Sequence, residues 1–127
     1  MAAQQVKTKT GVTWLDEEHG ILRFVYAAGA ECGLEEAKEN VVAQLALAQG
    51  KQIGILVDIA GAKSVDHAAR QHYAESKAFL ALALIGGPPI ARIIGNIFLA
   101  VYGSRDTPTR FFRSDTEAIA WLESFGG

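Results

Sequence analysis

The sequence contains little cysteine, little proline and no excess of basic residues. Its 127 residues include one Cys and three Pro, and 12 Lys and Arg against 14 Asp and Glu leave a formal net charge of -2. The single cysteine, Cys32, excludes an internal disulfide and a cysteine-based zinc site. Nucleic acids and anionic membranes attract clustered Lys and Arg, so this charge balance predicts no nucleic-acid partner.

The chain also lacks an uninterrupted apolar segment of membrane-spanning length. Residues 78–101 are the most apolar stretch, but a Gly-Gly-Pro-Pro sequence at 86–89 divides it, and Arg92 and Asn96 would lie in hydrocarbon. The first ten residues are polar and contain no apolar block typical of a signal peptide. We therefore expect a cytoplasmic protein with no membrane span, in which residues 1–10 are loosely ordered.

Hydrophobic residues make up 50% of the chain, which is enough to form one core at this length. The sequence shows no internal repeat, low-complexity block or linker. A single domain covering residues 1–127 is the expected organisation.

The first half of the chain has the patterns of a hairpin, a helix and a buried strand. Two β-rich runs, 13–15 and 21–26, flank a polar turn that ends in Gly20, which predicts an antiparallel hairpin. Residues 53–57 form an unbroken apolar run, typical of a central parallel strand. Residues 33–49 between them predict an amphipathic helix ended by Gly50, whose buried stripe comprises Leu34, Ala37, Val41, Leu45 and Ala48.

The second half continues the alternation. Ser64 or Asp66 can cap a helix that runs to about residue 74. The composition of residues 80–85 fits a helix or a strand, and their length and the following Gly-Gly favour a strand. A helix over 90–102, a strand over 109–112 and a final helix with a capping box at 114–117 complete the chain.

This order, β-β-α-β-α-β-α-β-α, predicts an α/β fold. Strands that alternate with helices form a largely parallel sheet, and the opening hairpin adds an antiparallel part. We expect a single-domain mixed sheet of about five strands with the helices packed on it.

Several short sequences support a more specific interpretation. They are Asp58-Ile59-Ala60-Gly61-Ala62 leading to Asp66, Ile85-Gly86-Gly87-Pro88, Arg92 to Asn96, and Pro108-Thr109-Arg110-Phe111-Phe112 followed by Ala118, Trp121 and Leu122. Together with the order of elements, they resemble the STAS/SpoIIAA-like proteins, small bacterial domains similar to anti-sigma factor antagonists. The resemblance extends from about Gly11 to the end of the chain. It implies a SpoIIAA-like fold and, more loosely, similarity to the lipid-binding CRAL-TRIO fold.

The resemblance also implies a regulatory role, with one departure. The antagonists carry an Asp followed by a phosphorylatable Ser at the start of a helix, where added phosphate changes a partner-binding surface. Asp66 matches that Asp, but His67 occupies the Ser position, and Ser64 lies three residues too early. The expected module therefore resembles an antagonist without its phosphoserine.

The candidate site residues follow the strands. Ligands in such sheets bind beyond the carboxyl ends of parallel strands, and Asp58, Asp66 and His67 lie in the segment after the central strand. They could form an acid/base set. The favoured interpretation is structural, in which Asp66 caps a helix, His67 is an exposed first-turn residue and Asp58 ends a strand. His67 and His72 are five residues apart and His19 lies in the hairpin turn. This spacing predicts no metal site, and we expect no cofactor.

Basic and apolar residues of the last third supply further candidates. Arg92 with Asn96, and Arg110, could bind an acidic ligand or a partner carboxylate, with structural ion pairs as the favoured alternative. The helix over 90–102 is apolar on almost every side. Its surplus apolar surface suggests a homodimer interface or an apolar ligand, unless neighbouring loops cover it. The residues expected at this interface are Phe98, Leu99 and Tyr102.

Three functions remain at this point. The first is a non-enzymatic regulatory or protein-interaction module that forms a homodimer. The second is a carrier or sensor of a small apolar ligand, by analogy with the CRAL-TRIO resemblance. The third is a hydrolase that uses His67 and Asp66.

Overall fold

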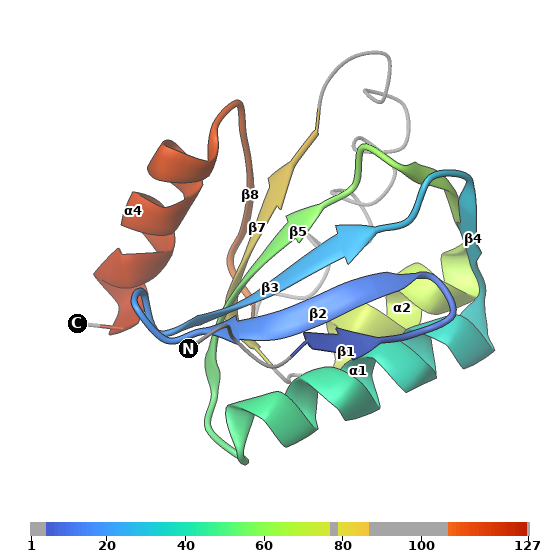
Figure 1. The fold of residues 1–127 in the computed structure, drawn as a ribbon, viewed down its shortest axis with the longest axis horizontal. Coiled ribbons are helices and arrows are strands. Elements are labelled where there is room, and N and C mark those ends of the chain that lie inside the picture. The colour runs from blue at the N-terminus through green and yellow to red at the C-terminus, as the bar shows by residue number, and fades with distance from the viewer. Residues whose placement is uncertain (1–4, 77–78, 87–106, 127) are drawn as a thin grey trace.

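A mixed β-sheet forms the centre of the protein in the computed structural model, which describes residues 5–76, 79–86 and 107–126 (Figure 1). The sheet has six strands in the order β1-β2-β3-β5-β7-β8, and β4 and β6 form a separate two-stranded pair. The strands are β1 (Gln5–Lys7), β2 (Gly11–Asp16), β3 (Ile21–Tyr26), β4 (Ala30–Cys32), β5 (Ile53–Asp58), β6 (Ala62–Val65), β7 (Phe79–Ile85) and β8 (Thr109–Phe112). The described helices are α1 (Leu34–Ala48), α2 (His67–Ser76) and α4 (Asp115–Gly126).

The sheet has the expected mixture of strand directions. β1, β2 and β3 are antiparallel neighbours, whereas β3, β5, β7 and β8 pair in parallel. This arrangement confirms the predicted α/β class, the opening hairpin and the strand over 80–85. It also places β5, the predicted central strand, between β3 and β7.

Helices cover both faces of the sheet. α1 and α2 lie on one face and α4 lies on the other (Figure 1). Side chains alternate along each strand, so Leu22 and Phe24 of β3 join the core under α1 and α2, whereas Ile21 joins the core under α4. The unbroken apolar run of β5 is explained by this double burial, because Ile55 and Leu56 pack into opposite cores.

The number of strands and the conformation of residues 5–7 differ from the prediction. The sheet has six strands instead of about five, because residues 5–7 form β1 although residues 1–10 were expected to be loosely ordered. β1 pairs with β2 at the edge of the sheet, with Val6 opposite Thr13 and Lys7 opposite Val12. A short, polar, lysine-bearing edge strand has no apolar alternation by which it could be recognised.

The β4–β6 pair was also not predicted. These strands have three and four residues and pair in parallel, too short for a periodic pattern. Ser64, one of the two expected helix caps, lies in β6, so that expectation was wrong for this residue. Asp66 is the cap of α2, since its Oδ1 accepts a hydrogen bond from the N–H of Ala69 at 2.8 Å.

Helix α1 buries a different face from the one predicted. Leu34 and Leu45 were expected in the buried stripe, but they are 37% and 41% exposed. Asn40 and Gln44 are buried in their place, beside Ala37, Val41 and Ala48. The apolar periodicity predicted the wrong buried face because polar groups of the N-terminal segment and of α2 lie against the face that is buried. The helix ends as expected, with Gln49 and Gly50 at positive φ of 54° and 76°.

Helix α4 packs closely on β5. Ser114 Oγ accepts a hydrogen bond from the N–H of Glu117 at 3.3 Å, which is one half of the predicted capping box. A Cβ atom on Gly54 would lie 2.9 Å from Cδ2 of Leu122, so this glycine permits the close approach. None of the helices in the described part of the chain combines the length and apolar character needed to cross a bilayer. The helix expected over 90–102 lies outside the described residues.

Candidate functional site

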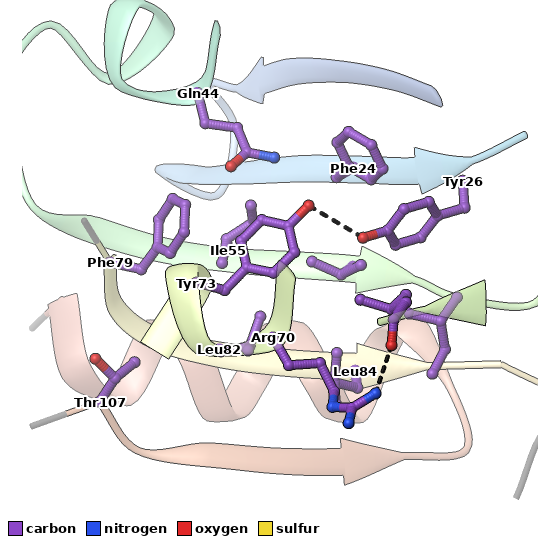
Figure 2. A pocket seen from close by; sticks show the side chains of 13 residues that line it. Phe24, Tyr26, Gln44, Ile55, Arg70, Tyr73, Phe79, Leu82, Leu84 and Thr107 are labelled. Carbon is purple, nitrogen blue, oxygen red and sulfur yellow. Dashed lines mark hydrogen bonds between the residues drawn. The ribbon is translucent and has the colours of Figure 1, made fainter. Parts of the chain in front are cut away.

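A cavity of about 50 Å³, partly open to solvent, lies between the sheet and helices α1 and α2. Its sheet wall is apolar and includes Phe24, Ile55, Phe79, Leu82 and Leu84 (Figure 2). These side chains come from three neighbouring strands. Strand alternation places Leu82 and Leu84 on the face of Ile55, which pairs with Leu82 across β5 and β7, whereas Phe79 reaches the same face beyond an irregularity in this register. The cavity therefore lies over the face of the sheet.

The helix wall supplies polar groups. Gln44 of α1 is 3% exposed, and its Oε1 atom has no hydrogen-bond partner. Arg70 of α2 donates a hydrogen bond from one terminal guanidinium nitrogen to the carbonyl of Val65, but its buried Nε has no partner. A buried polar atom that lacks a partner typically costs about 1–3 kcal/mol. Both residues line the cavity, and polar groups without a partner in an otherwise apolar wall are the pattern expected of a ligand site.

A hydrogen-bond network closes another side of the cavity. The hydroxyl groups of Tyr26 and Tyr73 are 3.2 Å apart, and both residues line the cavity (Figure 2). Asn40 Nδ2 donates to the Tyr73 hydroxyl at 2.9 Å, and the Cys32 sulfur lies 3.5 Å from the same oxygen. The network holds the Tyr73 ring in place and thereby fixes the shape of this wall.

The N-terminal segment completes the network behind Asn40. Thr8 Oγ1 donates to Asn40 Oδ1 at 2.7 Å, and Asn40 Nδ2 donates to Thr10 Oγ1 at 3.0 Å. All three side chains are buried. The connection between β1 and β2, which contains Thr8 and Thr10, thus anchors α1 on the sheet.

The ionisable members of this network are neutral at physiological pH. Burial raises the pKa of Tyr26 well above its usual value, and burial likewise raises the pKa of Tyr73 and of Cys32. A neutral, buried thiol is a poor nucleophile. The network therefore shapes the cavity and is poorly suited to acid/base or thiol chemistry.

The sequence-predicted site residues after the central strand are separate from the cavity. Asp58 Oδ1 accepts a hydrogen bond from the N–H of Ala60 at 2.9 Å, which stabilises the turn after β5. Asp66 caps α2, and the neighbouring His67 is exposed. Within the described residues, no hydrogen bond joins His67 to either aspartate. The structure thus shows these residues in the local roles that the sequence analysis favoured.

Of the remaining predicted site residues, only Arg110 lies in the part of the chain that the structure describes. Arg110 is exposed on β8, and its guanidinium lies 5.1 Å from the ring centroid of Phe112. That contact belongs to the α4 side of the sheet, away from the cavity. The other candidates lie outside the described residues, namely Arg92, Asn96, Phe98, Leu99 and Tyr102.

Residues 13–126 match the family described as Domain of unknown function (DUF7793). The chain belongs to this family. The matched range contains every residue of the cavity wall named above, whereas Thr8 and Thr10 precede it. No curated protein and no solved structure matches the chain.

A second cluster of titratable groups lies in the hairpin turn of this DUF7793 chain. Ligand atoms of Asp16, Glu18 and His19 lie within 4.8 Å of one another. The Asp16 carboxylate already pairs with His19 Nδ1 at 2.9 Å and with the Arg23 guanidinium at 3.3 Å. These contacts satisfy the carboxylate, so the cluster forms an ion-pair network at the start of β3.

Sequence reasoning missed Gln44, Arg70 and Tyr73, the residues that give the DUF7793 cavity its polar character. The sequence did contain a signal for Gln44. Gln44 lies seven residues after Ala37 and four before Ala48, so helical periodicity places it on the buried face of α1. A polar residue in such a stripe indicates an internal partner or a site. Arg70 and Tyr73 had no comparable signal, because α2 has few large apolar residues to define its buried face.

Proposed function

We propose that this chain is a non-enzymatic binding module that holds a small, mostly apolar molecule in the cavity between the sheet and helices α1 and α2. The observation that carries this proposal is the pair of buried, unpartnered polar atoms, Gln44 Oε1 and Arg70 Nε, which belong to residues that line an otherwise apolar cavity. A ligand that pairs with either atom would recover hydrogen-bond energy that the protein alone leaves unmade.

The size of the cavity restricts the ligand. Its volume of about 50 Å³ is small beside the roughly 150 Å³ of an engineered apolar cavity that binds benzene. The cavity is partly open, so part of the ligand can project into solvent. A short aliphatic molecule suits these dimensions, and a long lipid does not suit the described walls.

Binding fits the lining better than catalysis does. Among the described lining residues there is no carboxylate, imidazole or thiol, and the two tyrosines are neutral members of a buried network. The hydrolase alternative needs His67 and Asp66 beside a nucleophile, and Asp66 is engaged as the α2 cap. The geometry favours a carrier or sensor.

We also propose that the family is a SpoIIAA-like branch that works in the bacterial cytoplasm. The mixed sheet with parallel β3, β5, β7 and β8, and the position of Asp66 at the start of α2, support this relation. His67 stands where the antagonists carry a phosphorylatable Ser. Occupancy of the cavity, which α2 lines with Arg70 and Tyr73, would replace phosphorylation as the signal that alters this helix.

Methyl NMR of the full chain tests the binding proposal. Isobutanol is added to protein labelled at Ile, Leu and Val methyl groups. We expect saturable shifts for Ile55, Leu82 and Leu84, which line the cavity. Leu56, which packs under α4 on the opposite face, serves as the internal reference. Equal shifts on both faces, or none at the cavity, would contradict the proposal.

A cavity-filling variant sharpens this test. Leu82→Phe adds volume at the cavity wall, and we expect it to weaken isobutanol binding by at least roughly tenfold. Val42→Phe makes a similar change on the outer face of α1, where Val42 is 68% exposed, and should leave binding unchanged. Melting curves show whether both variants remain folded. Unchanged binding to folded Leu82→Phe would place the ligand elsewhere.

Association with a second copy is a further candidate function, favoured by the outer face of α1. Leu34, Val42 and Leu45 are exposed there, and at 100° per residue they fall within one stripe. By the same periodicity Lys38 lies within this stripe, where it pairs with Glu35 at 3.8 Å, so the surface carries both charge signs. An antiparallel pair of such helices can cover the apolar side chains and match opposite charges across a two-fold axis.

A further inference from the structure

Arg70 carries the unmatched charge of the cavity. It projects from α2 and lines the cavity together with Leu84 and the other apolar residues of the sheet wall (Figure 2). The Val65 carbonyl accepts from one terminal nitrogen, and the buried Nε has no partner. Val65 is a neutral acceptor, so the bond positions the side chain without neutralising it.

The described part of the protein provides no counter-ion for this guanidinium. The ion pairs found there join Lys9, His19, Arg23, Lys38 and Lys63 to acidic residues, and none of them includes Arg70. Arg70 is half-buried, so solvent reaches part of its side chain, but its buried Nε has no partner. A bound anion would supply the charge partner that the described residues do not provide.

We propose that Arg70 binds the carboxylate of a short-chain organic acid whose hydrocarbon part lies against Ile55, Leu82 and Leu84. This inference rests on the proposed function, because it assigns a head group to the ligand of the same cavity. A guanidinium presents two N–H groups in a fork that matches the two oxygens of a carboxylate. A single cation suits a monoanion, and apolar walls of this size suit a short aliphatic chain.

The buried amide of Gln44 is consistent with this assignment. In Figure 2, Gln44 and Arg70 lie on either side of Tyr73, so one short acid cannot be expected to contact both. The carboxylate takes the Arg70 side, where the positive charge is. Gln44 Oε1 is an acceptor and would repel a carboxylate, which gives the ligand a defined direction in the cavity.

Two probes of the same shape test the inference. Sodium isobutyrate and neutral isobutyramide are titrated into the full chain at constant ionic strength and neutral pH, with methyl shifts of Leu82 and Leu84 as the readout. We expect isobutyrate to bind roughly tenfold to a hundredfold more tightly, the usual gain from a hydrogen bond to a charged group. Arg70→Met should abolish this preference.

Matched variants control for charge and folding. Arg113→Met removes the same charge at an exposed position after β8 and should keep the preference for isobutyrate. If Arg70→Met fails to fold by circular dichroism, Arg70→Gln provides the same loss of charge with a polar end. Retention of the preference in a folded Arg70 variant would overturn the inference.

The two proposals fail in different ways. Equal binding of isobutyrate and isobutyramide at the cavity methyl groups would overturn the carboxylate assignment and leave the binding module intact. Absence of shifts with both probes and with isobutanol would overturn both proposals.

Discussion

Individual polar residues decide how the helices of this protein sit on its sheet. Asn40 is fully buried and joins the N-terminal segment to α2 through Thr8, Thr10 and Tyr73. An apolar stripe alone predicted Leu34 and Leu45 in the core of α1, and both are exposed. The hydrogen bonds of Asn40 explain the difference, because they are made only when the Asn40 face of α1 points inward.

His19 and Asp16 give a pH dependence that can be measured at one residue. The hydrogen bond to Asp16 raises the pKa of His19 above its usual value of 6.5. Burial would raise the pKa of Asp16, but the hydrogen bonds from His19 and Arg23 together bring it below its usual value of 3.8. The charged pair therefore stabilises the fold between these two values. Its contribution is lost as pH rises through the raised pKa of His19, and as pH falls through the lowered pKa of Asp16.

We expect an NMR titration of the His19 imidazole to show this raised pKa in the wild-type chain. Asp16→Asn removes the negative charge and should move the midpoint down toward 6.5. The same substitution should remove the contribution to the free energy of unfolding that is fully present between pH 3.8 and 6.5 and is lost as pH rises through the raised pKa of His19 or falls through the lowered pKa of Asp16. An unchanged His19 midpoint in Asp16→Asn would show that the pair is not formed.

At the scale of elements, periodic and capped segments were predictable and short ones were not. The strand over 53–57, the hairpin and the final helix follow from an unbroken apolar run, turn residues and a Ser114 cap, respectively. β1, β4 and β6 contain only three or four residues each and have no period. They exist because tertiary partners are present, such as β2 beside β1, and local sequence does not report such partners.

The docking of α4 on β5 supplies the prediction at this scale. Leu122 is 2% exposed and packs over Gly54, where the sheet has no side chain. We expect Leu122→Ala to lower the free energy of unfolding by about 3 kcal/mol, from lost burial and the cavity left behind. Urea denaturation followed by circular dichroism measures this change.

Glu123→Ala, one residue further along the same helix and exposed, is the matched control. It should change the free energy of unfolding by about 0.5 kcal/mol or less. Similar losses in the two variants would mean that α4 is not held by Leu122.

At the scale of the whole molecule, the class of fold could be predicted from the sequence but the cavity could not. The class of fold follows from the alternation of strands and helices, and Asp58, Asp66 and Arg110 could be placed on it. The cavity could not be predicted, because it depends on how α1 and α2 pack over three strands. Gln44 and Arg70 are separated by 26 positions by their numbering and meet the same cavity only through that packing.

Self-association through α1 is tested on the intact chain. We expect a dimer by light scattering at micromolar concentration, and we expect Val42→Glu to shift it toward monomer because it places charge in the exposed stripe. Val25→Glu, at an exposed position on the opposite face of the sheet, is the control. A monomeric wild-type chain, or a dimer that Val42→Glu leaves intact, would exclude this interface.

The central claim is that the space under α1 and α2 is a binding cavity. The most direct measurement is a crystal structure determined under xenon pressure, since xenon enters apolar cavities. We predict a xenon peak beside Ile55, Leu82 and Leu84. Side chains that fill this space and leave no peak there, with xenon bound only elsewhere, would contradict the account.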